Sequence, residues 1–282
     1  MLYVCMGPSF SAQQKLDICL LPNVSGPQQH DQLLTNGFNN AFPSTNPEGT
    51  KLVFRSTRDH DGDPNEYKNL YIMEEAESGD YGEGKITRLT TGNWVDTHCV
   101  WSPSGEWIVF SSTRDKPASA PPKDNDLDVG YFAVYLVNPK DPSVVVRVLR
   151  SADNIAGHVN HPLFNPDGKS IVVVADLAAV SVDPISLPLV EHSVRAYGDI
   201  FSVDIDKDDI KKNEDKKNFK RITHSRYENS TASWTMFSTE DPNATWNLQF
   251  SGKYTPACPY APDDGSESWH MTGHLCIPKR LC

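Results

Sequence analysis

Short apolar runs alternate with polar turns along this chain, and one arrangement of the two recurs three times. Each copy is a Pro-x-Gly turn followed at once by β-branched and aromatic residues, over 52–54, 108–110 and 171–174. Such runs favour strands and are too short for a buried helix. Proline sets φ near −65° and glycine supplies a positive φ, which suits a tight hairpin. We therefore expect two antiparallel strands around each turn, the first of them ending at Thr45, Trp101 or Phe164.

The repeat extends beyond the hairpin. The turn prolines, Pro47, Pro103 and Pro166, are 56 and 63 residues apart. A third strand is expected over 69–73, 132–137 and 199–203, and a fourth, both basic and apolar, over 86–90, 145–149 and 219–223. Tandem four-stranded units are the blades of a β-propeller. The predicted fold class is all-β, with three complete antiparallel blades and partial terminal blades; the alternative is another all-β sandwich of hairpins.

This pattern divides the chain into six segments. We letter the four strands of a blade a to d in chain order. Residues 1–36 form a partial first blade with strands b to d, and complete blades follow over 37–91, 92–150 and 151–225. Residues 226–250 hold strand a of a closing or further blade, with Trp234 in the place of Trp101. Residues 251–282 form an irregular extension that contains cysteine and proline, and Cys258 and Cys276 are its candidates for a disulfide.

The repeat resembles the TolB-type propeller repeat, with Asn165-Pro166-Asp167-Gly168-Lys169 as the copy nearest to its consensus. The Ser-Thr-Arg-Asp sequence after the second strand and the Trp-His-Met tail resemble plant TolB-like proteins. These are similar in turn to the N-terminal propeller of dipeptidyl peptidases. Members of that plant family are longer, so the resemblance implies the C-terminal part of a larger propeller. The other interpretation is a four-bladed ring, in which strand a from 226–250 completes the first blade.

Charge and composition exclude several classes of partner. The net charge of −11 disfavours nucleic acid and anionic membranes. No apolar run is long enough to span a membrane, and the N-terminal residues lack the pattern of a signal peptide. The basic run Lys211–Lys220 is interleaved with acidic residues and is interpreted as a solvated loop. The cysteine-containing tail and three glycosylation sequons favour a secreted protein; the sequons begin at Asn23, Asn229 and Asn243.

The loops around the predicted channel supply the candidate binding residues. Alignment on the turn proline brings one set of four residues to one position (Phe42, His98, His161 and Thr231) and a second set to its neighbour (Asn40, Asp96, Val159 and Asn229). His158 adds a third imidazole, so the loops could hold a metal ion; the alternative is a set of polar residues that surround a water-filled channel. Arg58 and Arg114 follow the second strand at equivalent positions; we expect an inter-blade ion pair or bonds to loop carbonyls, with anion binding as the alternative.

The acidic loop after the second strand suggests a weak calcium site. Asp59, Asp61 and Asp63 have the alternate spacing of a calcium loop, but Pro64 and Leu70 stand where an EF-hand needs glycine and glutamate. Solvated acidic turns are the competing interpretation, and we expect no other cofactor.

Motifs for catalysis are missing from the sequence. There is no Gly-x-Ser-x-Gly elbow, no phosphate loop and no zinc motif. We therefore expect a non-catalytic scaffold that binds a protein or peptide at its channel-side loops. The alternatives are a hydrolase or lyase acting on glycans or peptides at the channel, or the propeller part of a peptidase without its catalytic domain.

Overall fold

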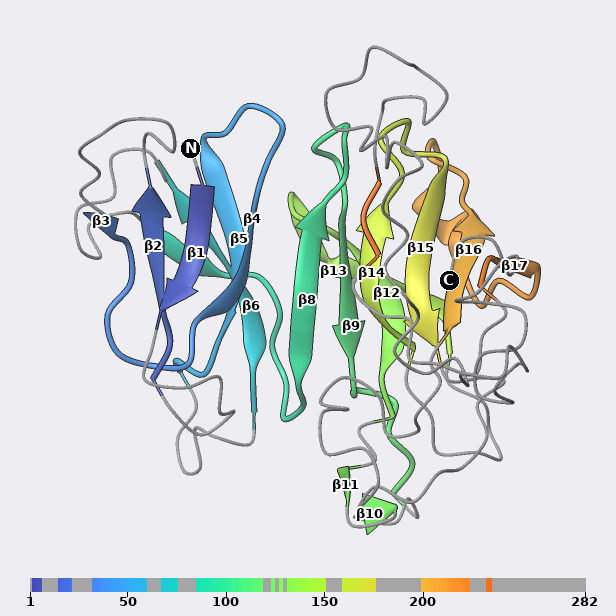
Figure 1. The fold of residues 1–282 in the computed structure, drawn as a ribbon, viewed down its shortest axis with the longest axis horizontal. Helices are drawn as coiled ribbons and strands as arrows, with labels where there is room; N and C mark the ends of the chain where they lie inside the picture. Colours follow the sequence, from blue (N-terminus) through green and yellow to red (C-terminus); the bar gives the residue numbers. More distant parts are fainter. Residues whose placement is uncertain are drawn as a thin grey trace, which may run out of the picture.

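The computed structural model describes residues 2–6, 15–21, 32–59, 67–75, 85–118, 123–124, 127–128, 131–150, 159–175, 199–223 and 232–234. Their strands form four main sheets, which follow one another across the molecule in chain order (Figure 1). The N-terminal sheet has the order β1-β2-β3, with bounds Leu2–Met6, Asp17–Leu21 and Gln32–Leu33. The second sheet has the order β4-β5-β6-β7, with bounds Ala41–Thr45, Lys51–Ser56, Asn69–Glu74 and Ile86–Arg88.

The third and fourth sheets repeat this meander. The third has the order β8-β9-β12-β13, with bounds Asp96–Trp101, Ile108–Ser112, Ala133–Asn138 and Asp141–Leu149. The fourth has the order β14-β15-β16-β17, with bounds Val159–Phe164, Ser170–Ala175, Asp199–Asp204 and Phe219–Arg221. A small hairpin, β10-β11 (Lys123–Asp124 and Leu127–Asp128), and the 3-10 helix η2 (Ile210–Asn213) complete the described elements.

These sheets confirm the all-β fold class and its four-stranded antiparallel units. Strands β4, β8 and β14 end at Thr45, Trp101 and Phe164, as the turn pattern predicts. Each Pro-x-Gly turn is closed by a hydrogen bond that the glycine amide donates to the carbonyl three residues earlier, and Gly49, Gly105 and Gly168 have φ of 71°, 72° and 69°. Glycine occupies this left-handed region without the steric cost that a Cβ brings, so the hairpins form where local chemistry places them.

The core lies between neighbouring sheets, because successive side chains of a strand point to opposite faces. In β5, Leu52 and Phe54 pack on the N-terminal sheet, and Val53 packs on the third sheet. In β9, Ile108 and Phe110 pack back on the second sheet, and Val109 packs on the fourth. Each middle strand is therefore apolar on both faces and reads as a continuous apolar run.

Three residues of the predicted closing strand, 232–234, lie in the described part of the chain. Residues 232–234 belong to no strand, and Trp234 is 37% exposed instead of packed like Trp101. The closing strand over 226–250 stays a prediction, because most of that segment lies outside the described residues. The cysteine-containing extension lies outside the described residues.

The basic run is more than the solvated loop that its charges suggest. Four of its lysines are exposed, as expected: Lys211, Lys212, Lys217 and Lys220. However, its backbone docks on β13 of the third sheet, since the amides of Asp215 and Lys216 donate to the carbonyls of Arg147 and Val148 at 2.8 Å. Arg147 also donates from Nε and Nη2 to the two carboxylate oxygens of Asp215, at 2.7 and 2.8 Å. Asp215, one of the acidic residues within the basic run, therefore anchors this segment to β13. The number of charges in the sequence could not show this contact.

Loss of this anchor should loosen the docked segment. The Arg147 hydrogen bonds hold the pKa of Asp215 below its usual value, so their stabilisation is present above the unfolded pKa of about 4 and disappears as pH falls through the lower folded pKa. Arg147→Met should cost about 1 kcal/mol, because the pair is partly exposed. We expect hydrogen exchange at Asp215 and Lys216 to be about fivefold faster at neutral pH. Lys212→Met, which breaks a more exposed pair with Asp206, should leave that exchange unchanged; equal effects would contradict the anchor.

Candidate functional site

Three planar side chains from successive sheets lie against one another at the same position of strand a. Phe42 lies in β4, His98 in β8 and His161 in β14. Ring centroids are 4.0 Å apart between Phe42 and His98 and 3.9 Å apart between His98 and His161. We call these three residues the channel column. The structure thus brings together His98 and His161, which the repeat alignment placed at one position.

A repeated backbone irregularity positions the column. The φ values of Phe42, His98 and His161 are 56°, 49° and 49°, and the pairing of each strand a with its strand b shifts register at this point. A positive φ is uncommon for residues with a Cβ and carries a conformational cost. A β-bulge re-aims side chains, and the same bulge in three sheets lets the three rings meet.

Arg55 extends the column with a positive charge. Its guanidinium lies 4.9 Å from the centre of the Phe42 ring. It donates to Oδ1 of Asn39 at 2.7 Å and, across the sheet boundary, to Oγ1 of Thr97 at 3.1 Å. The column residues are half-buried. The arrangement offers half-buried ring faces beside a cation, groups that recognise aromatic and carboxylate side chains.

Asp96 is a buried hub at the junction between the second and third sheets. Its carboxylate is fully buried and pairs with Arg114 of its own sheet at 3.1 Å. It also accepts from Oγ1 of Thr90, which follows β7, at 2.6 Å and from Nδ2 of Asn69, the first residue of β6, at 3.4 Å. Trp94 Nε1 donates to it at 3.1 Å. The Arg114 ion pair therefore lies within one sheet, not between two as expected, and Asp96 makes the link across.

Asn40 occupies, at the junction between the N-terminal and second sheets, the place that Asp96 has at the next junction. The carboxylate and the amide are exchanged between the two strands. Arg58 donates to Asn40 Oδ1 at 3.0 Å, and Asn40 Nδ2 donates to Asp17 at 3.3 Å. Thr35 Oγ1 also donates to Asp17, at 3.0 Å. Each of these two junctions thus holds one carboxylate, one amide, one threonine and one arginine. The carboxylate belongs to strand c at the first junction and to strand a at the second.

Aromatic rings enclose both arginines. The Arg58 guanidinium lies within about 5.5 Å of the ring centres of Phe38, Phe54 and Tyr71. Burial lowers the pKa of Arg58, and burial likewise raises the pKa of Tyr71. The Arg114 guanidinium lies at similar distances from Trp94, Phe110 and Tyr135. Arg58 donates to Ser56 and Asn40, and Arg114 donates to Ser112 and Asp96. Both arginines are thus built into the junctions, which favours the structural role over anion binding.

The remaining candidates are mostly beyond what the structure describes. His158, Asp61, Asp63, Asn23, Asn229, Asn243, Cys258 and Cys276 lie outside the described residues. Asp59 is described and has a left-handed backbone with φ of 61°. Within the described ranges no group of three histidine, cysteine, aspartate or glutamate side chains could hold a metal ion, and no helix reaches the length and apolarity of a membrane span.

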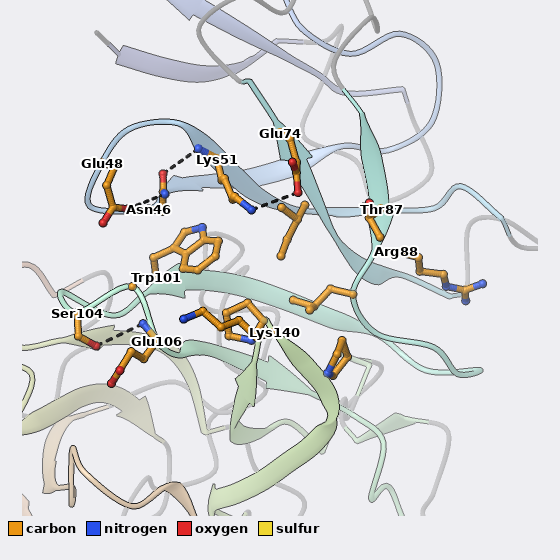
Figure 2. Close-up of a pocket in the computed structure, with 15 residues that line it drawn as sticks. Asn46, Glu48, Lys51, Glu74, Thr87, Arg88, Trp101, Ser104, Glu106 and Lys140 are labelled. Carbon is orange, nitrogen blue, oxygen red and sulfur yellow. Dashed lines mark hydrogen bonds and ion pairs between the residues drawn. The ribbon is translucent and has the colours of Figure 1, made fainter.

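A pocket that the sequence did not indicate lies between the second and third sheets (Figure 2). It has a volume of about 400 Å³. Its walls come from the a–b turns of both sheets, the d strand of the second and the β12–β13 turn of the third, so we call it the turn-side pocket. It lies at the opposite end of the strands from the loops predicted to bind ligand. The residues that line it are spread along the sequence between Asn46 and Pro142, so no local motif could have predicted it.

Comparison with known proteins identifies the fold. No protein-family model and no curated protein sequence matches the chain. The structure is similar to a TolB-type protein from Agrobacterium tumefaciens, with a TM-score of 0.51 and 23% identity over 78% of this chain and 59% of that one. It is also similar to TolB from Acinetobacter baumannii, with a TM-score of 0.45 and 15% identity over 75% and 41% of the two chains.

A puromycin-hydrolysing peptidase from Mycobacterium tuberculosis shows a TM-score of 0.43 and 12% identity over 79% of this chain and 30% of the peptidase. At these identities the likeness concerns the fold. The chain has a TolB-like β-propeller fold, and it spans about three fifths of the length of the Agrobacterium protein.

Proposed function

We propose that this chain is a non-catalytic binding scaffold that holds a protein or peptide partner at the channel face of its sheets. The observation that supports this most is the channel column, in which rings from equivalent positions of three sheets lie against one another. A catalytic site usually combines residues with different roles. Here one repeated position supplies Phe42, His98 and His161, which suits a contact surface.

The polar residues near the column support the same proposal. Asp96, the best-buried carboxylate of the region, is saturated by Arg114, Thr90, Asn69 and Trp94. A general base must be able to reach a proton on the substrate, and this carboxylate is committed to the fold. Half-buried rings with a nearby guanidinium match the aromatic and arginine anchors that dominate protein interfaces.

A hydrolase or lyase at the same face is the alternative, and the contact between the two imidazoles is the feature that favours it. Histidine is the commonest general acid or base. In that case His98 and His161 would move protons, and their loss would abolish turnover instead of affinity.

One experiment separates the two. Peptides selected from a random phage-displayed library on the wild-type chain should bind the double variant His98→Ala/His161→Ala about tenfold or more weakly, since loss of an interface anchor typically costs about 2 kcal/mol. Lys169→Met, in the exposed a–b turn of the fourth sheet, is the control and should bind normally. Failure to select any peptide would contradict the proposal, as would turnover of a glycan or peptide substrate that the double variant loses.

A further inference from the structure

We propose that the turn-side pocket binds a neutral carbohydrate of one or two sugar rings. This site is separate from the channel column and does not depend on the function proposed for it. The pocket lies where two sheets meet at their turns: a Cβ on Gly105 would lie 3.3 Å from Cδ of Pro47, so the two a–b turns are in contact. Its volume of about 400 Å³ lies at the lower end of the range for small-molecule sites.

The charges of the lining cancel. Three cationic side chains, Lys51, Arg88 and Lys140, balance three carboxylates, Glu48, Glu74 and Glu106. Within the pocket, Lys51 pairs with Glu74 at 3.1 Å. A lining of zero net charge offers no advantage to an ion of either sign.

Other lining groups are held by the fold, and two remain available. Glu48 accepts from Asn46 at 2.7 Å, and Arg88 donates to the side chain of Asn69 and to the carbonyl of Thr90. The side chains of Lys140 and Glu106 make no hydrogen bond or ion pair within the described part of the chain. In Figure 2, Lys140 extends across the pocket below Trp101. Lys140 and Glu106 come from two turns of the third sheet, and a donor and an acceptor in one pocket suit hydroxyl groups, which both donate and accept.

Apolar groups supply the rest of the surface. Ile72, Leu89 and Trp101 are largely buried and form the floor, and Pro139 and Pro142 line the side. Trp101 Nε1 is buried and has no acceptor among the described residues. A sugar ring combines C–H faces with hydroxyl edges, so it matches a floor of this kind within a polar rim. A purely apolar ligand would leave the charged rim desolvated, which is unfavourable.

Binding of disaccharides to the full chain tests the proposal. Cellobiose, maltose, xylobiose, mannobiose and chitobiose would be titrated by calorimetry and by saturation-transfer NMR. We expect at least one to bind with a dissociation constant of about 1 mM or lower. Glu106→Gln/Lys140→Met should weaken it about tenfold, the usual effect of losing a charge-assisted hydrogen bond. Both residues lie in turns at the surface, so the double variant should fold.

The matched control is Lys169→Met, because Lys169 follows the turn glycine of the fourth sheet as Glu106 follows that of the third. It should leave sugar binding unchanged. Absence of binding to all five disaccharides would overturn the proposal, and so would full affinity in the double variant. Displacement of the sugar by glycylglycine at equal concentration would instead assign the pocket to a zwitterion. His98→Ala/His161→Ala should bind the sugar normally, so failure here is distinct from failure of the channel-face proposal.

Discussion

Asp96→Val is expected to destabilise the protein by about 3–5 kcal/mol, the cost of leaving a buried cation without its partner. The Arg114 side chain is 15% exposed and the Asp96 side chain is fully buried. The substitution also removes the acceptor of Thr90 and Trp94. Urea unfolding would measure the change. Asp204→Val, at an exposed end of β16, is the control and should change stability by less than about 0.5 kcal/mol.

Another junction of this protein shows which apolar residues could replace the buried ion pair. At the junction between the third and fourth sheets, Ala133 and Val159 occupy the places of Asn69 and Asp96, and both are buried. Position 177, which lies as far after Pro166 as Arg114 lies after Pro103, is leucine. At the two positions that the structure describes at both junctions, the residues are therefore polar between the second and third sheets and apolar between the third and fourth.

We expect the triple variant Asn69→Ala/Asp96→Val/Arg114→Leu to recover at least half of the stability that Asp96→Val loses. Well-packed apolar residues can replace a buried ion pair at little or no cost, and residues in one network are not additive. A triple variant that is less stable than Asp96→Val alone would show that the network is needed for more than its charge balance.

Asn69→Asp is expected to be the second large effect, with a loss of about 2–3 kcal/mol. Asn69 is fully buried, and its Nδ2 lies 3.4 Å from Asp96 Oδ2. The substitution brings two carboxylates together and removes donors to the carbonyls of Lys68 and Gly92. Like charges at this distance in a buried site are costly.

The exchange Asn69→Asp/Asp96→Asn should recover part of that loss, because it reproduces the order of the first junction. There Asp17 stands on strand c, and Asn40 accepts from Arg58 and donates to Asp17. Thermal unfolding of the two variants, measured together with Asp96→Asn to complete the cycle, gives the coupling free energy directly. A coupling free energy of zero would mean that the side chains at positions 69 and 96 do not interact.

The positions of the strands follow from sequence because their causes are local. Pro-x-Gly fixes the a–b hairpin through the φ preferences of two residues, and β-branched runs such as Ile171–Val174 favour extended backbone. The in-phase alignment also placed His98 beside His161, since equivalent residues of successive blades face the same axis. The alignment could not show that a bulge with positive φ brings their rings to 3.9 Å.

By itself, then, the sequence determined the all-β repeat, the residues at which the first strands end and the likeness of three units. The tertiary structure decided which polar residues meet. Arg147 and Asp215 are 68 residues apart and join two sheets, Asp96 collects partners from two sheets, and the turn-side pocket exists only where two turns touch. Such contacts depend on how neighbouring sheets twist and pack, which no residue encodes locally. Short-range chemistry therefore set the blades, and packing between them set the sites.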